Sequence, residues 1–167
     1  MPIENERKYV LPADFDAGRL KGWTRYDIRQ AYLDDGPRIR QKNDAYIFTY
    51  KRWIPEVKEL VEIETAISRD DFDLLWSQRG EALEKTRFEK VIGDSEWVVD
   101  FLRDPSGEVY FVLAEAELPR YQAQPDSLPA EIAGSILHAV AAEDNRFTNK
   151  KLSDVDYARR LFEKVAD

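Results

Sequence analysis

The sequence predicts an α+β protein built around an eight-stranded antiparallel β-barrel with peripheral helices. Eight segments have the composition of strands, and short turns join most of them, which favours antiparallel pairing. Several of these strands carry charged side chains at alternate positions, and alternate side chains share one face of a strand. A barrel suits such strands, because a closed sheet has no edges and can enclose a charged interior with a ligand. For some strands, an open sheet with one solvated face remains the alternative.

The first half of the barrel is expected from four strands, over residues 2–11, 24–34, 38–42 and 45–53. Pro12 ends the first strand, and a short helix over 13–21 follows, with Gly22 just beyond it. The residues Asp-Asp-Gly-Pro at 34–37 and Asn-Asp at 43–44 are typical of turns between strands.

The second half is expected from the strands over residues 57–67, 82–92, 95–102 and 108–118. Ser68 is placed to cap a helix over 69–79, which ends at Gly80. Gly93-Asp94 and the residues 104–107 are typical of turns. The tail, 128–165, is helical at both ends around a polar middle, 143–151.

The length of 167 residues indicates a single domain, 1–167, with a barrel core over about 2–118 and a helical tail over about 128–165. The net charge of −8, with no run of lysine and arginine, argues against nucleic-acid binding. The absence of cysteine excludes disulfides and thiolate metal sites. No stretch approaches the ~20 apolar residues of a membrane span, and no apolar signal region begins the chain, so a cytoplasmic location is expected.

Charged pairs recur at alternate positions along the predicted strands. Glu4, Glu6 and Lys8 share one face, and two carboxylates beside an ammonium can hold a divalent cation next to a phosphate. The other pairs are Glu62 with Glu64, Glu115 with Glu117, Arg38 with Arg40, and Lys85 with Arg87. One such pair usually marks a solvated face, but five in one small domain favour a charged interior. The lone His138, by contrast, lies among apolar residues and is expected to serve packing.

The ordered motifs resemble those of the CYTH superfamily, the triphosphate tunnel metalloenzymes. After Glu4-x-Glu6-x-Lys8 come RQAYL, RIR, YIFTYK, VEIE, EKTRF, VVDF, AEAE and NRFTNKKL. The resemblance spans residues 3–152 and implies that the barrel forms a triphosphate tunnel. Two features depart from the family. Leu60 stands where an arginine is common, so one phosphate contact is either missing or supplied elsewhere, with Lys58 as the candidate, and the turn DPSGE is inserted after Asp100. We expect this insertion to alter one tunnel mouth.

The resemblance implies a metal site of magnesium or manganese at the first and last Glu-x-Glu pairs. Both ions favour oxygen ligands, and a cation between the carboxylates would allow a triphosphate to bind beside them. The expected ligands are Glu4, Glu6, Asp100, Glu115 and Glu117. Glu62 and Glu64 are instead candidates for holding the arginines in place.

Basic side chains are expected to surround the triphosphate, since arginine and lysine both bind phosphate oxygens. These substrate-binding candidates are Lys8, Arg38, Arg40, Lys51, Lys85 and Arg87. The resemblance also places Tyr32 and Lys51 in the tunnel, where we expect them to assist proton transfer; the alternative for Tyr32 is barrel packing. Lys150 and Lys151 either close over the substrate or belong to a solvated loop.

Three classes of function follow from these expectations. The first is a metal-dependent hydrolase of inorganic tripolyphosphate or a small organic triphosphate, releasing phosphate. The second is a class IV-type adenylyl cyclase, and the third is a non-catalytic binder of polyphosphate or phosphorylated ligands. The hydrolase leads, because the site residues recognise phosphate or metal and none recognises a base. The expected partner is a small-molecule triphosphate, without nucleic acid or membrane, and a homodimer remains open.

Overall fold

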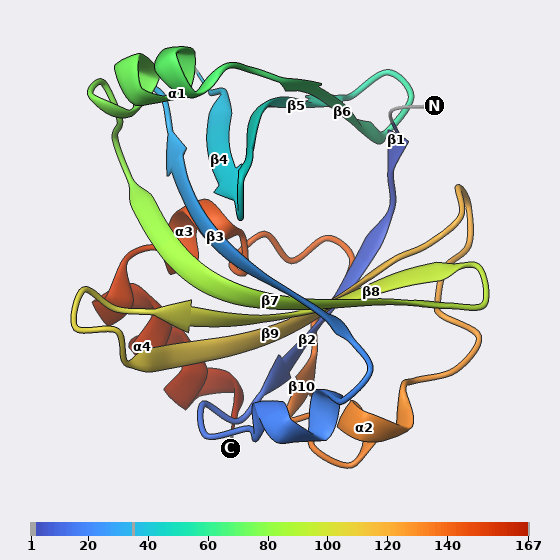
Figure 1. Cartoon of the computed structure of the whole chain (residues 1–167). Coiled ribbons are helices and arrows are strands. Elements are labelled where there is room, and N and C mark those ends of the chain that lie inside the picture. The colour runs from blue at the N-terminus through green and yellow to red at the C-terminus, as the bar shows by residue number, and fades with distance from the viewer. Residues whose placement is uncertain (1–2, 35, 167) are drawn as a thin grey trace.

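The computed structural model describes residues 3–34 and 36–166, and its main element is one curled antiparallel sheet (Figure 1). The strands are β1 (Ile3–Glu4), β2 (Glu6–Leu11), β3 (Thr24–Tyr32), β4 (Arg38–Lys42), β5 (Ala45–Ile54), β6 (Glu59–Ala66), β7 (Ala82–Ile92), β8 (Ser95–Arg103), β9 (Val109–Glu117) and β10 (His138–Ala139). Their order across the sheet is β1-β6-β5-β4-β3-β7-β8-β9-β2-β10. Residue 2, at the expected start of the first strand, and Asp35, in the expected turn at 34–37, lie outside the described residues.

The expectation of a closed eight-stranded barrel is wrong: the described residues form ten strands in a sheet that is not closed. The first expected strand is divided at Asn5, and the tail contributes β10. β1 pairs with β6 at one end of the sheet, whereas β2 pairs with β9 and β10 at the other. Asn5 holds the bend between them, because its amide group donates to the carbonyls of Pro119 (2.9 Å) and Gln122 (2.8 Å). The first expected strand therefore pairs with one end of the sheet before Asn5 and with the other end after it.

The strand register brings the charged pairs of the sequence opposite one another. Lys8 lies across from Glu115 in the β2–β9 pair, and Lys51 lies across from Glu62 in the β5–β6 pair. Arg87 lies across from Asp100 in the β7–β8 pair. Since alternate residues share a face, this register collects acids and bases on the inner face of the curled sheet.

The helices are shorter than expected. They are η1 (Ala17–Leu20), α1 (Arg69–Trp76), α2 (Ala130–Ala133), α3 (Asn149–Leu152) and α4 (Val155–Val165). Ser68 caps α1 as predicted, accepting a hydrogen bond from the backbone N–H of Asp71 at 3.0 Å. The helix ends at Trp76, before Gly80: the N–H groups of Gln78 and Arg79 bond carbonyls three residues back, and the N–H of Gly80 bonds the carbonyl of Tyr32, at the end of β3 (2.8 Å).

The helix expected over 13–21 is a single 3₁₀ turn, since the Asp16 side chain accepts from Gly18 and starts the turn late.

The tail divides the inside of the curled sheet into an apolar end and a charged end. Phe111 and Leu113 share a face of β9 with Glu115, and they pack with Phe147 and Leu161 of the tail. α1 packs on the other face, where Phe72 contacts Ile39. Because apolar surface is covered at these places, the rest of the inner face is left to charged side chains. In the described part of the chain, no helix is long and apolar enough to cross a membrane.

Candidate functional site

A cavity of about 670 Å³ lies at the charged end of the inner face, and strands from both halves of the sheet line it. Every residue expected at the site lines this cavity, except Lys85 and Asp100, which are buried next to the lining residue Arg87. Leu60 also lines it, but Lys58 and the inserted turn at 104–108 do not. Asp104 of that turn instead forms an ion pair with Arg159 of α4 (3.8 Å). The structure thus gathers the predicted residues, while their roles remain predictions.

Asp100 is completely buried and binds two cations. Its carboxylate accepts from Lys85 Nζ at 2.8 Å and from Arg87 Nε and a terminal guanidinium nitrogen at 2.7 and 2.8 Å. Burial alone raises the pKa of Asp100, but the charges of Arg87 and Lys85 outweigh burial and keep the pKa well below its usual range. Burial, together with the neighbouring Arg87, lowers the pKa of Lys85. A metal at Asp100 would have to compete with both cations.

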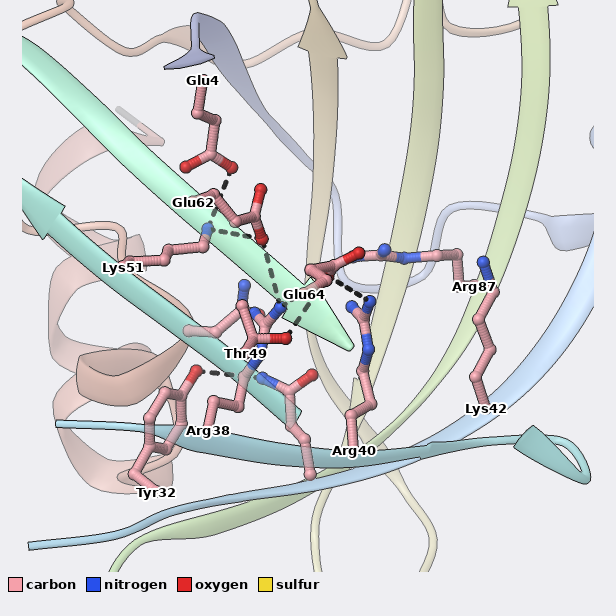
Figure 2. Close-up of polar contacts among 12 residues, drawn as sticks. Glu4, Tyr32, Arg38, Arg40, Lys42, Thr49, Lys51, Glu62, Glu64 and Arg87 are labelled. Carbon is pink, nitrogen blue, oxygen red and sulfur yellow. Dashed lines mark hydrogen bonds and ion pairs between the residues drawn. The ribbon is translucent and has the colours of Figure 1, made fainter. Parts of the chain in front are cut away.

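Arg38 and Arg40 point toward the two acids of β6, Glu62 and Glu64, as Figure 2 shows. Arg38 is 3.6 Å from Glu62 and 3.7 Å from Glu64, and Arg40 is 3.3 Å from Glu64. The Nε atom of each arginine is buried and has no partner in the described structure. Burial and the charge of Arg38 lower the pKa of Arg40 to about 10. These ion pairs are the contacts through which Glu62 and Glu64 would orient the guanidinium groups of Arg38 and Arg40.

Two of the lysines that line the cavity, Lys51 and Lys8, pair with the N-terminal acids. Lys51 Nζ lies 2.9 Å from Glu4 and 3.8 Å from Glu62 (Figure 2). Lys8 Nζ lies 3.5 Å from Glu6 and donates to the carbonyl of Phe147 at 3.2 Å. The tail therefore contacts the site directly.

Carboxylates crowd together at Glu115 and Glu117. Burial and the charges of Glu4, Glu62, Glu6 and Glu96 raise the pKa of Glu117 to about 7. Burial and Glu6 also raise the pKa of Glu115. One oxygen each of Glu4 and Glu115 is buried without a hydrogen-bond partner in the described structure. This donor set fits a hard divalent cation, although no three acidic side chains among the described residues already form a metal-ligand cluster.

Four residues that the sequence reasoning missed also belong to the site. Lys42 contacts Glu89 at 2.7 Å, and both line the cavity. Strand alternation was the available signal, since Lys42 shares a face with Arg40, and Glu89 shares one with Arg87. Gln30 donates from Nε2 to the Tyr32 hydroxyl oxygen at 2.9 Å, and Asn149 accepts from Lys85 at 3.3 Å. The latter contact joins distant segments, and no local pattern predicts it.

The two tail lysines have different environments. Lys150 lines the cavity together with Thr148 and Asn149. Lys151 is instead bonded to its own loop, donating to the carbonyl of Asn145 at 3.0 Å. His138 packs against Phe147 with the two rings tilted and their centroids 5.7 Å apart, as expected of a packing residue.

The sequence matches no family model and no curated protein. The fold is similar to that of the hypothetical protein NE1496, with 27% identity, a TM-score of 0.58, and coverage of 90% of this chain and 97% of the other. It is also similar to the PH1012 protein from Pyrococcus horikoshii OT3, with 13% identity, a TM-score of 0.55 and coverage of 71% and 80%. A candidate adenylate cyclase from Bacillus halodurans shares 19% identity, with a TM-score of 0.50 and coverage of 70% and 82%. These similarities are consistent with a CYTH-like fold.

Proposed function

We propose that this protein is a metal-dependent triphosphatase that hydrolyses inorganic tripolyphosphate or a small organic triphosphate. The observation that carries this proposal is the composition of one cavity, in which basic side chains from β2, β4, β5 and β7 face carboxylates from β1, β2 and β9. A triphosphate carries several negative charges and binds metal ions, so it is complementary to both halves of this lining.

The basic residues would bind the phosphate oxygens. Arg38 and Arg40 offer planar guanidinium groups, and their unpartnered buried Nε atoms are donors that a phosphate oxygen can satisfy. Lys8 and Lys51 supply compact charges at the N-terminal side of the cavity. Positioning and neutralisation of charge are the main demands of phosphoryl transfer, and this lining meets them.

The acidic residues would hold magnesium or manganese. The crowded carboxylates of Glu4, Glu6, Glu115 and Glu117 fit such an ion, because binding it would relieve the repulsion that raises the pKa of Glu117. When bound, the ion would neutralise phosphate charge and lower the pKa of a bound water. Asp100 is the weaker candidate ligand, since Lys85 and Arg87 already occupy its oxygens.

The protein residues would align the triphosphate for attack by water on the terminal phosphorus. The bond from that phosphorus to the bridging oxygen breaks, and diphosphate leaves with the bridging oxygen. Tyr32 and Lys51 line the cavity and are our candidates for assisting the proton transfers that accompany this step.

The test is a substrate panel of tripolyphosphate, ATP and thiamine triphosphate with Mg²⁺, Mn²⁺ or excess chelator. Phosphate, diphosphate and cyclic AMP are measured separately. We expect phosphate from tripolyphosphate, no turnover in chelator, and loss of turnover in Glu117→Ala. The matched control is Glu84→Ala, an exposed acid of β7 outside the cavity lining. Cyclic AMP from ATP without activity on tripolyphosphate would favour the cyclase, and binding without any product would favour the non-catalytic binder.

A further inference from the structure

Gln30 is buried on the inner face of β3, beside the proposed site. Its exposed fraction is 0%, and its strand partners are Arg40 on β4 and Leu83 on β7. Its hydrogen bond runs from the amide Nε2 to the Tyr32 hydroxyl oxygen, at 2.9 Å (Figure 2, dashed line at Tyr32). Tyr32 itself lines the cavity, next to its strand partner Arg38.

The chemistry of this contact determines which way the tyrosine proton points. An amide NH₂ group only donates hydrogen bonds, so the Tyr32 oxygen is the acceptor at this contact. The hydroxyl proton must then be directed away from Gln30, and a bound anion in the cavity can accept it. A hydroxyl held in this way is already oriented to donate to a phosphate oxygen when the substrate binds, which avoids the cost of reorientation during the reaction.

Gln30 is also a poor choice for stability. Its amide oxygen is buried and has no hydrogen-bond partner in the described structure, an arrangement that destabilises a fold. An apolar side chain of similar length would fill the same space without that cost. Departures from good packing chemistry concentrate at functional sites, so this residue is better explained by its contact with Tyr32 than by packing.

We propose that Gln30 is a positioning residue that fixes Tyr32 as a hydrogen-bond donor to the triphosphate. This inference rests on the proposed function and deepens it, because it assigns Tyr32 the role of donor to the substrate. Gln30 acts through Tyr32 and is not itself among the residues that line the cavity.

The test is a double-mutant cycle of Gln30→Met and Tyr32→Phe, assayed with tripolyphosphate and by thermal unfolding. Losing one orienting hydrogen bond should lower kcat about five- to ten-fold in Gln30→Met, with KM changed by less than about two-fold. The melting temperature should hold or rise, because the unpartnered amide oxygen is gone. In the Tyr32→Phe background, Gln30→Met should have no further effect. A purely structural role would not produce this pattern.

The matched control is Gln41→Met. Gln41 also donates from Nε2 to a tyrosine hydroxyl, that of Tyr46 at 3.5 Å, but from the other face of the neighbouring strand β4. This variant should leave kcat unchanged. If Gln30→Met does not fold, Gln30→Glu replaces it. The carboxylate accepts a hydrogen bond from the Tyr32 hydroxyl and turns it away from the substrate, so kcat should again fall, and the fall should disappear in Tyr32→Phe.

The outcomes separate this inference from the proposed function. If the wild type turns over tripolyphosphate and Gln30→Met has the same kcat, the role of Gln30 is overturned while the proposed function stands. The same holds if Gln30→Met lowers kcat equally in the wild-type and the Tyr32→Phe backgrounds. If the wild type binds tripolyphosphate without turning it over, the same double-mutant cycle is measured through the Kd for tripolyphosphate. Gln30→Met should then weaken binding only when Tyr32 is present. A wild-type protein that neither binds nor hydrolyses tripolyphosphate overturns both proposals.

Discussion

Asp100 shows how one buried residue supports the basic side of the cavity. It is the shared partner of Lys85 and Arg87, and the side chains of Lys85 and Asp100 are both fully buried. A buried cation without its counter-charge is strongly unfavourable, so the position of these two bases depends on this carboxylate. The sequence placed Asp100 among the metal ligands, whereas its observed contacts are with the two bases.

We predict that Asp100→Asn lowers the free energy of unfolding by about 3–5 kcal/mol, because Lys85 and Arg87 lose their buried partner. Urea unfolding measures the change. The control is Asp27→Asn, which removes a pair with Arg25 in which both side chains are more than half exposed. That change should stay within about 0.5 kcal/mol. Equal effects of the two substitutions would contradict the assignment of Asp100.

At the scale of elements, the tail is part of the site as well as of the core. Phe147 and Leu152 are completely buried, and the Tyr110 hydroxyl of β9 donates to the carbonyl of Leu152 at 2.7 Å. These contacts fix the short helix α3, whose first residues line the cavity. A segment anchored by buried side chains at both ends and by a hydrogen bond is a fixed wall of the site.

We predict that Lys150→Ala raises the KM for tripolyphosphate about ten-fold, since the cavity loses a positive charge beside the phosphate. Lys151→Ala is the matched control, because the neighbouring lysine is bonded to Asn145 outside the cavity. Steady-state kinetics at constant ionic strength compares the two variants. The same KM in both would show that α3 does not contact the substrate.

At the scale of the whole molecule, a chain with a net charge of −8 encloses a group of cations. The lowered pKa of Arg40 records the cost of this arrangement, which arises from burial and from the nearby Arg38 and Arg87. Such a site is strained when empty, and an anion that binds only the folded protein stabilises it.

We predict that Arg40→Met keeps or raises the melting temperature without ligand, because repulsion within the cavity falls. The gain in melting temperature on adding tripolyphosphate with Mg²⁺ should shrink, and kcat/KM should fall at least ten-fold. Arg52→Met, at an exposed arginine of β5, is the control and should change neither quantity. A clear loss of stability with normal tripolyphosphate binding would show that Arg40 is structural.

Most of the strands and the charged inner face could be predicted from the sequence by itself. Strand alternation is a local property, so Arg38 and Arg40 had to share a face wherever β4 lay in the sheet. The turn residues between β7 and β8 likewise predict a hairpin without reference to the rest of the chain. The same local rule could have identified Lys42 and Glu89.

Only the tertiary structure decided how the sheet ends and which charges meet. The bend at Asn5 depends on carbonyls more than a hundred residues away, and it divides the first expected strand into β1 and β2, which pair at opposite ends of the sheet. The capture of Asp100 by two cations, and the different environments of Lys150 and Lys151, depend on register and on the docking of the tail. The physical reason is that spacing along a strand determines its faces, whereas partners across strands are selected by long-range pairing and burial.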